Sequence, residues 1–238
     1  MPTESHARTA RYLGAAFVFQ FATSLAAGLV SWSILTGTPA QVLLNITSDL
    51  GRMRASIVLF LLTSVGIIVM TSLLYVVLSD QNRAVALVAL GLWMAEAVLL
   101  AVKTLGLYAL VDLSAGHVGA GTPASYRQTL GALWLEVSQH AGQIDMVFFG
   151  LGAMLWYCVL LQSRIVPRLL PLWGLVSVPL VLVATVVLVW DDSLDPSVAL
   201  YALYVPFELV LGLWLLIKGV AIPRAPTEAA PARRASAS

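Results

Sequence analysis

Two carboxylates, a histidine, two glutamine amides and a serine lie within ten residues, EVSQHAGQID, at positions 136–145. An apolar run that suits lipid, MVFFGLGAMLWYCVLL, follows directly. These polar groups can exchange protons or hold a polar ligand. A charged group costs about 2.5–3.5 kcal/mol at the centre of a membrane helix, so ionisable residues there usually face a protein interior or a water-filled cavity. This segment is therefore a candidate for function.

Acidic residues near the middle of three different apolar runs extend the candidate set. Glu96, Asp145 and Glu208 are expected at similar depth. Three acids cannot all be ionised in a dry core, so either some are neutral or bases and water reach them. We therefore expect a polar cavity that opens to the outer side. The candidates for ligand binding or proton relay are Arg54, Glu96, Lys103, Glu136, His140, Gln143, Asp145 and Glu208.

Helical spacing sorts these candidates by face. Glu96 and Lys103 are seven residues apart, which places them on one face about 10.5 Å apart along the axis. At that distance only a third group or water can join them. The alternative for Lys103 is that its ammonium reaches the outer headgroups.

The polar segment at 136–145 is expected to be polar on two sides. Glu136, His140 and Gln143 fall at i, i+4 and i+7 and form one stripe, whereas Asp145 shares a face with Ser138. The alternative for Glu136 is a position in the headgroup zone, because the helix is longer than the hydrocarbon core. Asp145 lies closer to the bilayer middle.

Proline precedes the last acidic candidate by two residues. Pro206 is expected to remove a helix hydrogen bond and to kink the helix beside Glu208. A carboxylate at a kinked turn occurs at binding sites, but a purely structural kink explains the pair equally well.

The composition of the whole chain predicts an integral membrane protein. Of its 238 residues, 60% are hydrophobic and 11% are charged, with a mean hydropathy of +0.91. Globular domains carry about 25% charged residues, and roughly 20 apolar residues cross a bilayer core about 30 Å thick. The predicted fold class is all-α, a polytopic transmembrane helical bundle over residues 12–220. The predicted spans are 12–36, 55–79, 84–111, 133–162, 169–190 and 197–220.

Basic residues near the span ends predict the orientation, because cytoplasmic loops carry an excess of Lys and Arg. With the N-terminal segment 1–11 inside, the cytoplasmic side holds Arg8, Arg11, Arg83, Arg164, Arg168, Lys218, Arg224, Arg233 and Arg234, and the outer side holds Arg52, Arg54 and Arg127. Both termini are therefore predicted to be cytoplasmic in a bacterial plasma (inner) membrane. Residues 221–238 are Pro/Ala-rich and are predicted to be a disordered tail.

Several chemistries are disfavoured by the composition. The single cysteine, Cys158, excludes an internal disulfide and a cysteine-based metal cluster within one chain. Of three histidines only His140 lies at membrane depth, so we predict no metal site and no cofactor. A net charge of +1 gives no field that would draw nucleic acid. In the apolar helix, Gly150 and Gly152 are expected to permit close packing.

Two longer stretches carry a family resemblance. LYVVLSDQNRAVALVALGLWMAEA (74–97) and FFGLGAMLWYCVLLQSRIVPRLLPLWGL (148–175) combine a leucine-rich span, a short Asn-Arg link, an acidic span and an S-R-x-x-P-R motif. This pattern resembles a bacterial six-helix membrane family catalogued as domain of unknown function 4386. The resemblance covers about residues 8–220. It implies the architecture and carries over no catalytic residue.

Three functions remain open on the sequence. The leading hypothesis is binding or transport of a small polar or amphipathic molecule, with proton coupling. The alternatives are an intramembrane enzyme that uses Glu136 and His140 as acid/base groups, and a structural or sensor subunit; the sequence favours a role other than catalysis. The expected partners are the lipid bilayer and a small molecule, and a six-helix transporter would be expected to form a homo-oligomer.

Overall fold

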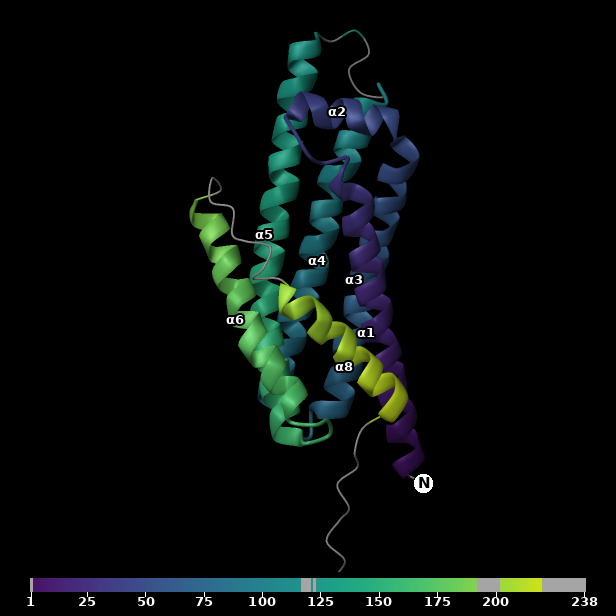
Figure 1. Ribbon diagram of the computed structural model, residues 1–238, viewed down its shortest axis with the longest axis vertical. Helices are drawn as coiled ribbons and strands as arrows, with labels where there is room; N and C mark the ends of the chain where they lie inside the picture. The colour runs from purple at the N-terminus through teal and green to yellow at the C-terminus, as the bar shows by residue number, and fades with distance from the viewer. Residues whose placement is uncertain (1, 117–120, 122, 192–201, 220–238) are drawn as a thin grey trace, which may run out of the picture.

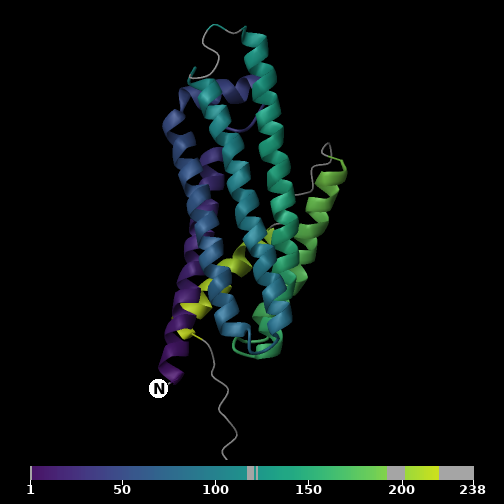
Figure 2. The ribbon, with the colours of Figure 1, turned by 180° about the vertical axis from the view of Figure 1, so that it is seen from behind.

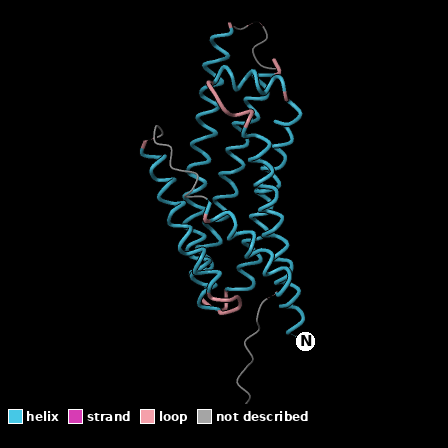
Figure 3. Tube along the Cα trace, viewed as in Figure 1, coloured by secondary structure: helices cyan, strands magenta, loops and turns pink. Residues whose placement is uncertain are grey.

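The computed structural model describes residues 2–116, 121, 123–191 and 202–219. Within these residues the chain is all helical and contains no strand (Figure 3). Five of the helices are long and apolar enough to cross a membrane, as expected of an integral membrane protein. The helices are α1 (Pro2–Trp32), α2 (Pro39–Ser48), α3 (Leu50–Leu78), α4 (Arg83–Ser114), α5 (Ala124–Ser163), α6 (Leu169–Trp190) and α8 (Tyr204–Lys218), and the five long apolar ones are α1, α3, α4, α5 and α6.

The long helices form an antiparallel bundle in which chain neighbours pack together. α1 packs on α3, α3 on α4, α4 on α5 and α5 on α6. Figures 1 and 2 show that α6 leans away from the bundle, that α2 lies across one end and that α8 crosses α1 obliquely near the other end. We call these the α2 end and the N-terminal end.

Helix α2 lies in the link between the first two predicted spans and was not predicted. Thr38 caps it through its side chain and Gln41 completes a capping box, with Pro39 in the first turn. Val42 and Ile46 are buried beneath the helix. Ten residues are too few to span a bilayer, so a search for long apolar runs passes over such a helix.

Helix α5 is longer than the span predicted at 133–162, because it begins at Ala124. Its 40 residues correspond to about 60 Å, twice the thickness of a bilayer core. Counted back from Ser163, Glu136 lies about 40 Å along the axis and Asp145 about 27 Å. This length explains how a polar segment and an apolar run share one helix.

The expected close packing at Gly150 and Gly152 is confirmed. A Cβ at Gly150 would lie 2.4 Å from Leu182 Cδ2, and one at Gly152 would lie 2.4 Å from Trp93 Cδ1. The two glycines therefore bring α6 and α4 close to α5.

The last helix is shorter than the span predicted at 197–220. α8 has 15 residues and is not among the five long apolar helices, and residues 192–201 lie outside the described part of the chain. Pro206 occupies the first turn of α8, where its missing N–H has no partner within this helix to lose; the kink expected beside Glu208 stays a prediction, because residues 192–201 lie outside the described part of the chain. Because Gly14 approaches Leu216 and Gly212 approaches Phe17, α8 runs antiparallel to α1 and ends near the N-terminal end.

Candidate functional site

Carboxylates from three helices line one half-open cavity of the bundle. Glu96 on α4, Asp145 on α5 and Glu208 on α8 are 5%, 2% and 8% exposed. All three border a cavity of about 220 Å³, together with Lys103. We call this the acidic cavity. Glu96 lies within electrostatic range of both Asp145 and Glu208, so the structure brings together the three acids that the sequence predicted at one depth.

Lys103 is held beside this cluster by two contacts. Its Nζ lies 4.6 Å from the centroid of the Phe60 ring, a cation–π geometry. Its aliphatic chain passes over Gly142, where an added Cβ would lie 3.4 Å from Cδ. Asp145 is its charged neighbour. The Lys103 ammonium therefore faces α3 and α5 inside the protein.

A second, larger cavity adjoins the acidic cavity at Lys103 and Asp145. It measures about 690 Å³ and contains polar side chains from α5, among them Ser138, Gln139 and Gln143. Lys103, Asp145 and Met146 border both cavities. Its other walls include the end of α1 and Leu188 of α6. We call this the α2-side cavity. The lysine and the aspartate thus form the boundary between two hollow regions.

Three buried oxygens on the wall of the acidic cavity have no hydrogen-bond partner within the described residues: Gln20 Oε1, Glu96 Oε2 and Asp145 Oδ1. More than nine-tenths of each of these three side chains is buried. Buried polar atoms are normally satisfied, and each exception needs an explanation. The amide oxygen is an acceptor, and so are the oxygens of an ionised carboxylate, so a hydrogen-bond donor would satisfy all three atoms when Glu96 and Asp145 are ionised.

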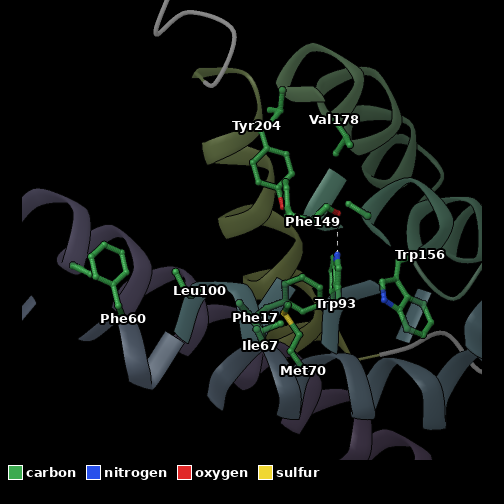
Figure 4. Packing of buried hydrophobic residues seen from close by; sticks show 14 of the residues in the cluster. Phe17, Phe60, Ile67, Met70, Trp93, Leu100, Phe149, Trp156, Val178 and Tyr204 are labelled. Atoms are coloured by element: carbon green, nitrogen blue, oxygen red, sulfur yellow. Dashed lines mark hydrogen bonds between the residues drawn. The ribbon is translucent and has the colours of Figure 1, made fainter. Parts of the chain in front are cut away.

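An aromatic cluster fixes the wall of the cavity. The Trp93 indole N–H donates to the carbonyl of Phe149 at 3.0 Å, the dashed line in Figure 4. The Phe149 ring meets the Tyr204 ring edge-on at 5.1 Å, and the Tyr204 and Tyr157 hydroxyls lie 3.2 Å apart. These contacts join α4, α5 and α8, so they hold Glu96, Asp145 and Glu208 in register.

Three predicted candidates lie outside both cavities. Glu136, His140 and Arg54 are exposed side chains and border neither cavity. Gln143, from the same predicted stripe, is half-buried and borders the α2-side cavity. The separate face predicted for Asp145 is borne out, because Ser138 is buried with it and donates to the Lys103 carbonyl at 3.0 Å.

Sequence reasoning missed several cavity residues. Gln20 on α1 is 7% exposed and interrupts the apolar stretch AAFVFQFATSL. Unlike Gln143, this amide has no ionisable residue beside it in the sequence, and the cost of burying an amide without a partner is the only signal that could have found it. Phe60 and Tyr204 gave no signal, because aromatic residues are ordinary in apolar helices.

Metal coordination was not predicted. Within the described residues, no three His, Cys, Asp or Glu side chains are grouped so that they could hold one metal ion. Glu96, Asp145 and Glu208 therefore share a cavity without converging on a single point.

The long apolar helices and the buried ionisable cluster define a class, that of helical integral membrane proteins with buried polar groups. The family model described as "Domain of unknown function (DUF4386)" matches residues 12–219. The chain belongs to this family, and the resemblance predicted from the sequence is thereby confirmed. No curated protein and no solved structure matches the chain.

Proposed function

We propose that this protein binds a small polar or amphipathic molecule inside the membrane and moves it across the bilayer together with protons. The observation that carries the proposal is that carboxylates from α4, α5 and α8 line one cavity of an otherwise apolar bundle. Carboxylates in membrane spans are costly and recur in proton relays of pumps and transporters. A purely structural cluster would pair its polar atoms, whereas two of these carboxylates have an unpartnered oxygen within the described residues.

The order of the ionisable groups supports the proton coupling. Glu208 interacts electrostatically with Glu96, Glu96 with Asp145, and Asp145 with Lys103. The last two border the α2-side cavity as well. A proton passed along this series would travel from the acidic cavity to the boundary of the α2-side cavity. When Asp145 or Lys103 loses or gains a proton, the charge beside the ligand changes. This change would couple the movement of the ligand to the movement of protons.

We further propose that the chain crosses a bacterial inner membrane six times, with both termini in the cytoplasm. The end of α8 lies beside the N-terminal part of α1, which supports placing the two ends on one side. The excess of basic residues supports assigning that side to the cytoplasm. In this orientation the α2-side cavity faces outward.

Transport assays in vesicles test the proposed function. Purified wild type and a Glu96→Gln/Asp145→Asn double variant are reconstituted separately, a proton gradient is imposed, and a mixed pool of small molecules is added outside. Mass spectrometry then measures which compounds accumulate in the lumen. Asp80→Asn is the control, because Asp80 is an exposed carboxylate in the link between α3 and α4.

We expect gradient-dependent accumulation of a limited set of compounds with wild type and with Asp80→Asn. The double variant should lose it, and so should wild type when the gradient is dissipated. Identical lumen contents for the folded wild type and the folded double variant would favour a structural role for the carboxylates.

A further inference from the structure

We infer that the ligand of the acidic cavity is a small organic cation, a protonated amine with an apolar or aromatic body. The inference rests on the proposed function, since it names the substrate class of that same site. It comes from three observations: the balance of charge, the type of the unpartnered atoms, and the size and lining of the cavity.

The charge balance of the cavity favours a cation. Three carboxylates, Glu96, Asp145 and Glu208, face one ammonium, that of Lys103. The first residues of α8 also line the cavity, and a helix N-terminus contributes roughly half a positive charge. The three acids cannot all be ionised in a dry cavity with one ammonium as counter-charge, and each acid that does ionise needs a positive partner. A cation would supply such a partner, whereas an anion would be repelled by every ionised carboxylate.

The unpartnered atoms specify a hydrogen-bond donor. Gln20 Oε1, Glu96 Oε2 and Asp145 Oδ1 come from three helices, and all three are acceptors when the two acids are ionised. An ammonium group carries up to three N–H donors and no acceptor, so one group could satisfy several of these oxygens. Hydrogen bonds from an ammonium to a carboxylate are roughly twice as strong as neutral ones.

The size and lining of the cavity favour a polyatomic cation over a bare metal ion. The volume of about 220 Å³ exceeds the roughly 150 Å³ of an apolar cavity that holds benzene. Four aromatic rings line it, those of Phe21, Phe60, Phe149 and Tyr204. Aromatic faces attract organic ammonium groups, and the carboxylates are not grouped to hold one metal ion within the described residues.

Lys103 already shows how a cation is held here. Its ammonium lies over the Phe60 ring at 4.6 Å and has Asp145 as charged neighbour. An incoming ammonium would meet the same ring and the same carboxylate. Lys103 is therefore a tethered competitor, and its removal should strengthen cation binding rather than weaken it.

Calorimetric titration of the purified protein in nanodiscs tests the inference. The probes are 2-phenylethylammonium and tetramethylammonium as cations, 2-phenylethanol as a neutral compound of similar size, 3-phenylpropionate as an anion, and sodium chloride. We expect saturable binding of at least one organic cation and no more than weak binding of the other probes. Glu96→Gln and Asp145→Asn should weaken cation binding about ten- to hundredfold. Lys103→Met should tighten it, and Asp80→Asn should leave it unchanged.

Several results would overturn the inference. They are a preference for 3-phenylpropionate, equal affinity for 2-phenylethanol, equal affinity for sodium, weaker cation binding by folded Lys103→Met, or no saturable binding of either organic cation. Failure of the proposed function is distinguishable. If organic cations bind but do not accumulate under a proton gradient, the inferred substrate class stands and the proposed transport fails. If only anions or neutral compounds accumulate, the proposed transport stands and the inferred substrate class fails.

Discussion

Buried carboxylates set the energetics of this protein at the residue scale. A charged group taken from water into a medium of low dielectric constant loses hydration, and unmade hydrogen bonds add to the cost. Glu96 and Asp145 are almost fully buried, and each has an oxygen without a partner within the described residues. These two side chains should therefore lower the stability of the fold, which is typical of groups placed for function rather than for packing.

Replacing Glu96 by glutamine should stabilise the protein. The amide has nearly the same shape, cannot ionise, and removes the repulsion that Asp145 and Glu208 exert on a charged Glu96. A gain of about 1 kcal/mol corresponds to a rise of about 2–4 °C in melting temperature for a domain of this size. Intrinsic tryptophan fluorescence during heating in detergent measures it. Asp80→Asn should be neutral, and a fall in the melting temperature of Glu96→Gln would show that its carboxylate makes a stabilising contact.

Trp93 should be a structural anchor of the same site. Phenylalanine at this position loses the 3.0 Å hydrogen bond to the Phe149 carbonyl and leaves a gap beside Gly152. We expect a loss of about 2 kcal/mol in the free energy of unfolding, from the hydrogen bond and the removed ring atoms together. Thermal melts measure it against Trp190→Phe, because Trp190 is 90% exposed. Equal melting temperatures for the two variants would contradict the anchoring role.

The cost of burying charge made part of the site predictable from the sequence, but it did not show which ionisable residues lie outside the site. Glu96, Asp145 and Glu208 could be found because ionisable groups at membrane depth need a special environment. Glu136 and His140 carry the same chemistry, but they lie on another face of a helix longer than the bilayer core. The position of the neighbouring helices decides which face of a helix points into the protein. The sequence pattern indicates this face only weakly, because lipid and protein interior are both apolar.

Close approaches between helices decide the arrangement at the element scale. α8 docks on α1 where Gly14 and Gly212 remove side chains from the crossing. The indole of Trp173 donates to the Leu203 carbonyl at 3.0 Å and so holds the start of α8 against α6. These contacts explain why a helix of only 15 residues keeps Glu208 at the acidic cavity. Apolar run length located the five long helices and included α8 in the span predicted at 197–220, but it gave neither the short length of α8 nor its crossing with α1.

Substitution of Gly14 should release α8. A Cβ at Gly14 would lie 2.2 Å from the Leu216 backbone nitrogen, and a main chain cannot move aside as a flexible side chain can. We expect Gly14→Ala to destabilise the protein by more than about 2 kcal/mol, in the range of strong overpacking. Thermal melting measures the loss. Gly28→Ala on the same helix is the matched control, because nothing lies within 4 Å of its added Cβ, and it should be neutral or slightly stabilising. Similar melts for the two alanine variants would show that α8 does not depend on this crossing.

At the scale of the whole molecule, the two cavities and the direction of α8 together make the two ends of the bundle different from each other. The acidic cavity is bordered by α8, which ends near the N-terminal end of the bundle, and the α2-side cavity extends toward the other end. A pathway for solutes needs such a sequence of hollow regions along the bundle axis. The order of the helices could be read from the chain, whereas the cavities arise from side chains of six helices that no single span contains.

The proposed orientation makes the two ends of the bundle chemically distinguishable in intact cells. Single cysteines can be placed in a Cys158→Ser background at Ser48, near the α2 end, at Gln81, in the link between α3 and α4, and at Lys218, the last residue of α8. All three positions are exposed. Because the excess of basic residues predicts a cytoplasmic N-terminal end, a membrane-impermeant maleimide added to whole bacterial cells should label Ser48→Cys and spare Gln81→Cys and Lys218→Cys until the cells are lysed. Labelling of Gln81→Cys and Lys218→Cys before lysis, with Ser48→Cys spared, would show that the bundle has the opposite orientation. Labelling of both Ser48→Cys and Lys218→Cys before lysis would instead show that α8 does not complete a sixth crossing, and it would leave Glu208 on a helix that enters and leaves the membrane from one side.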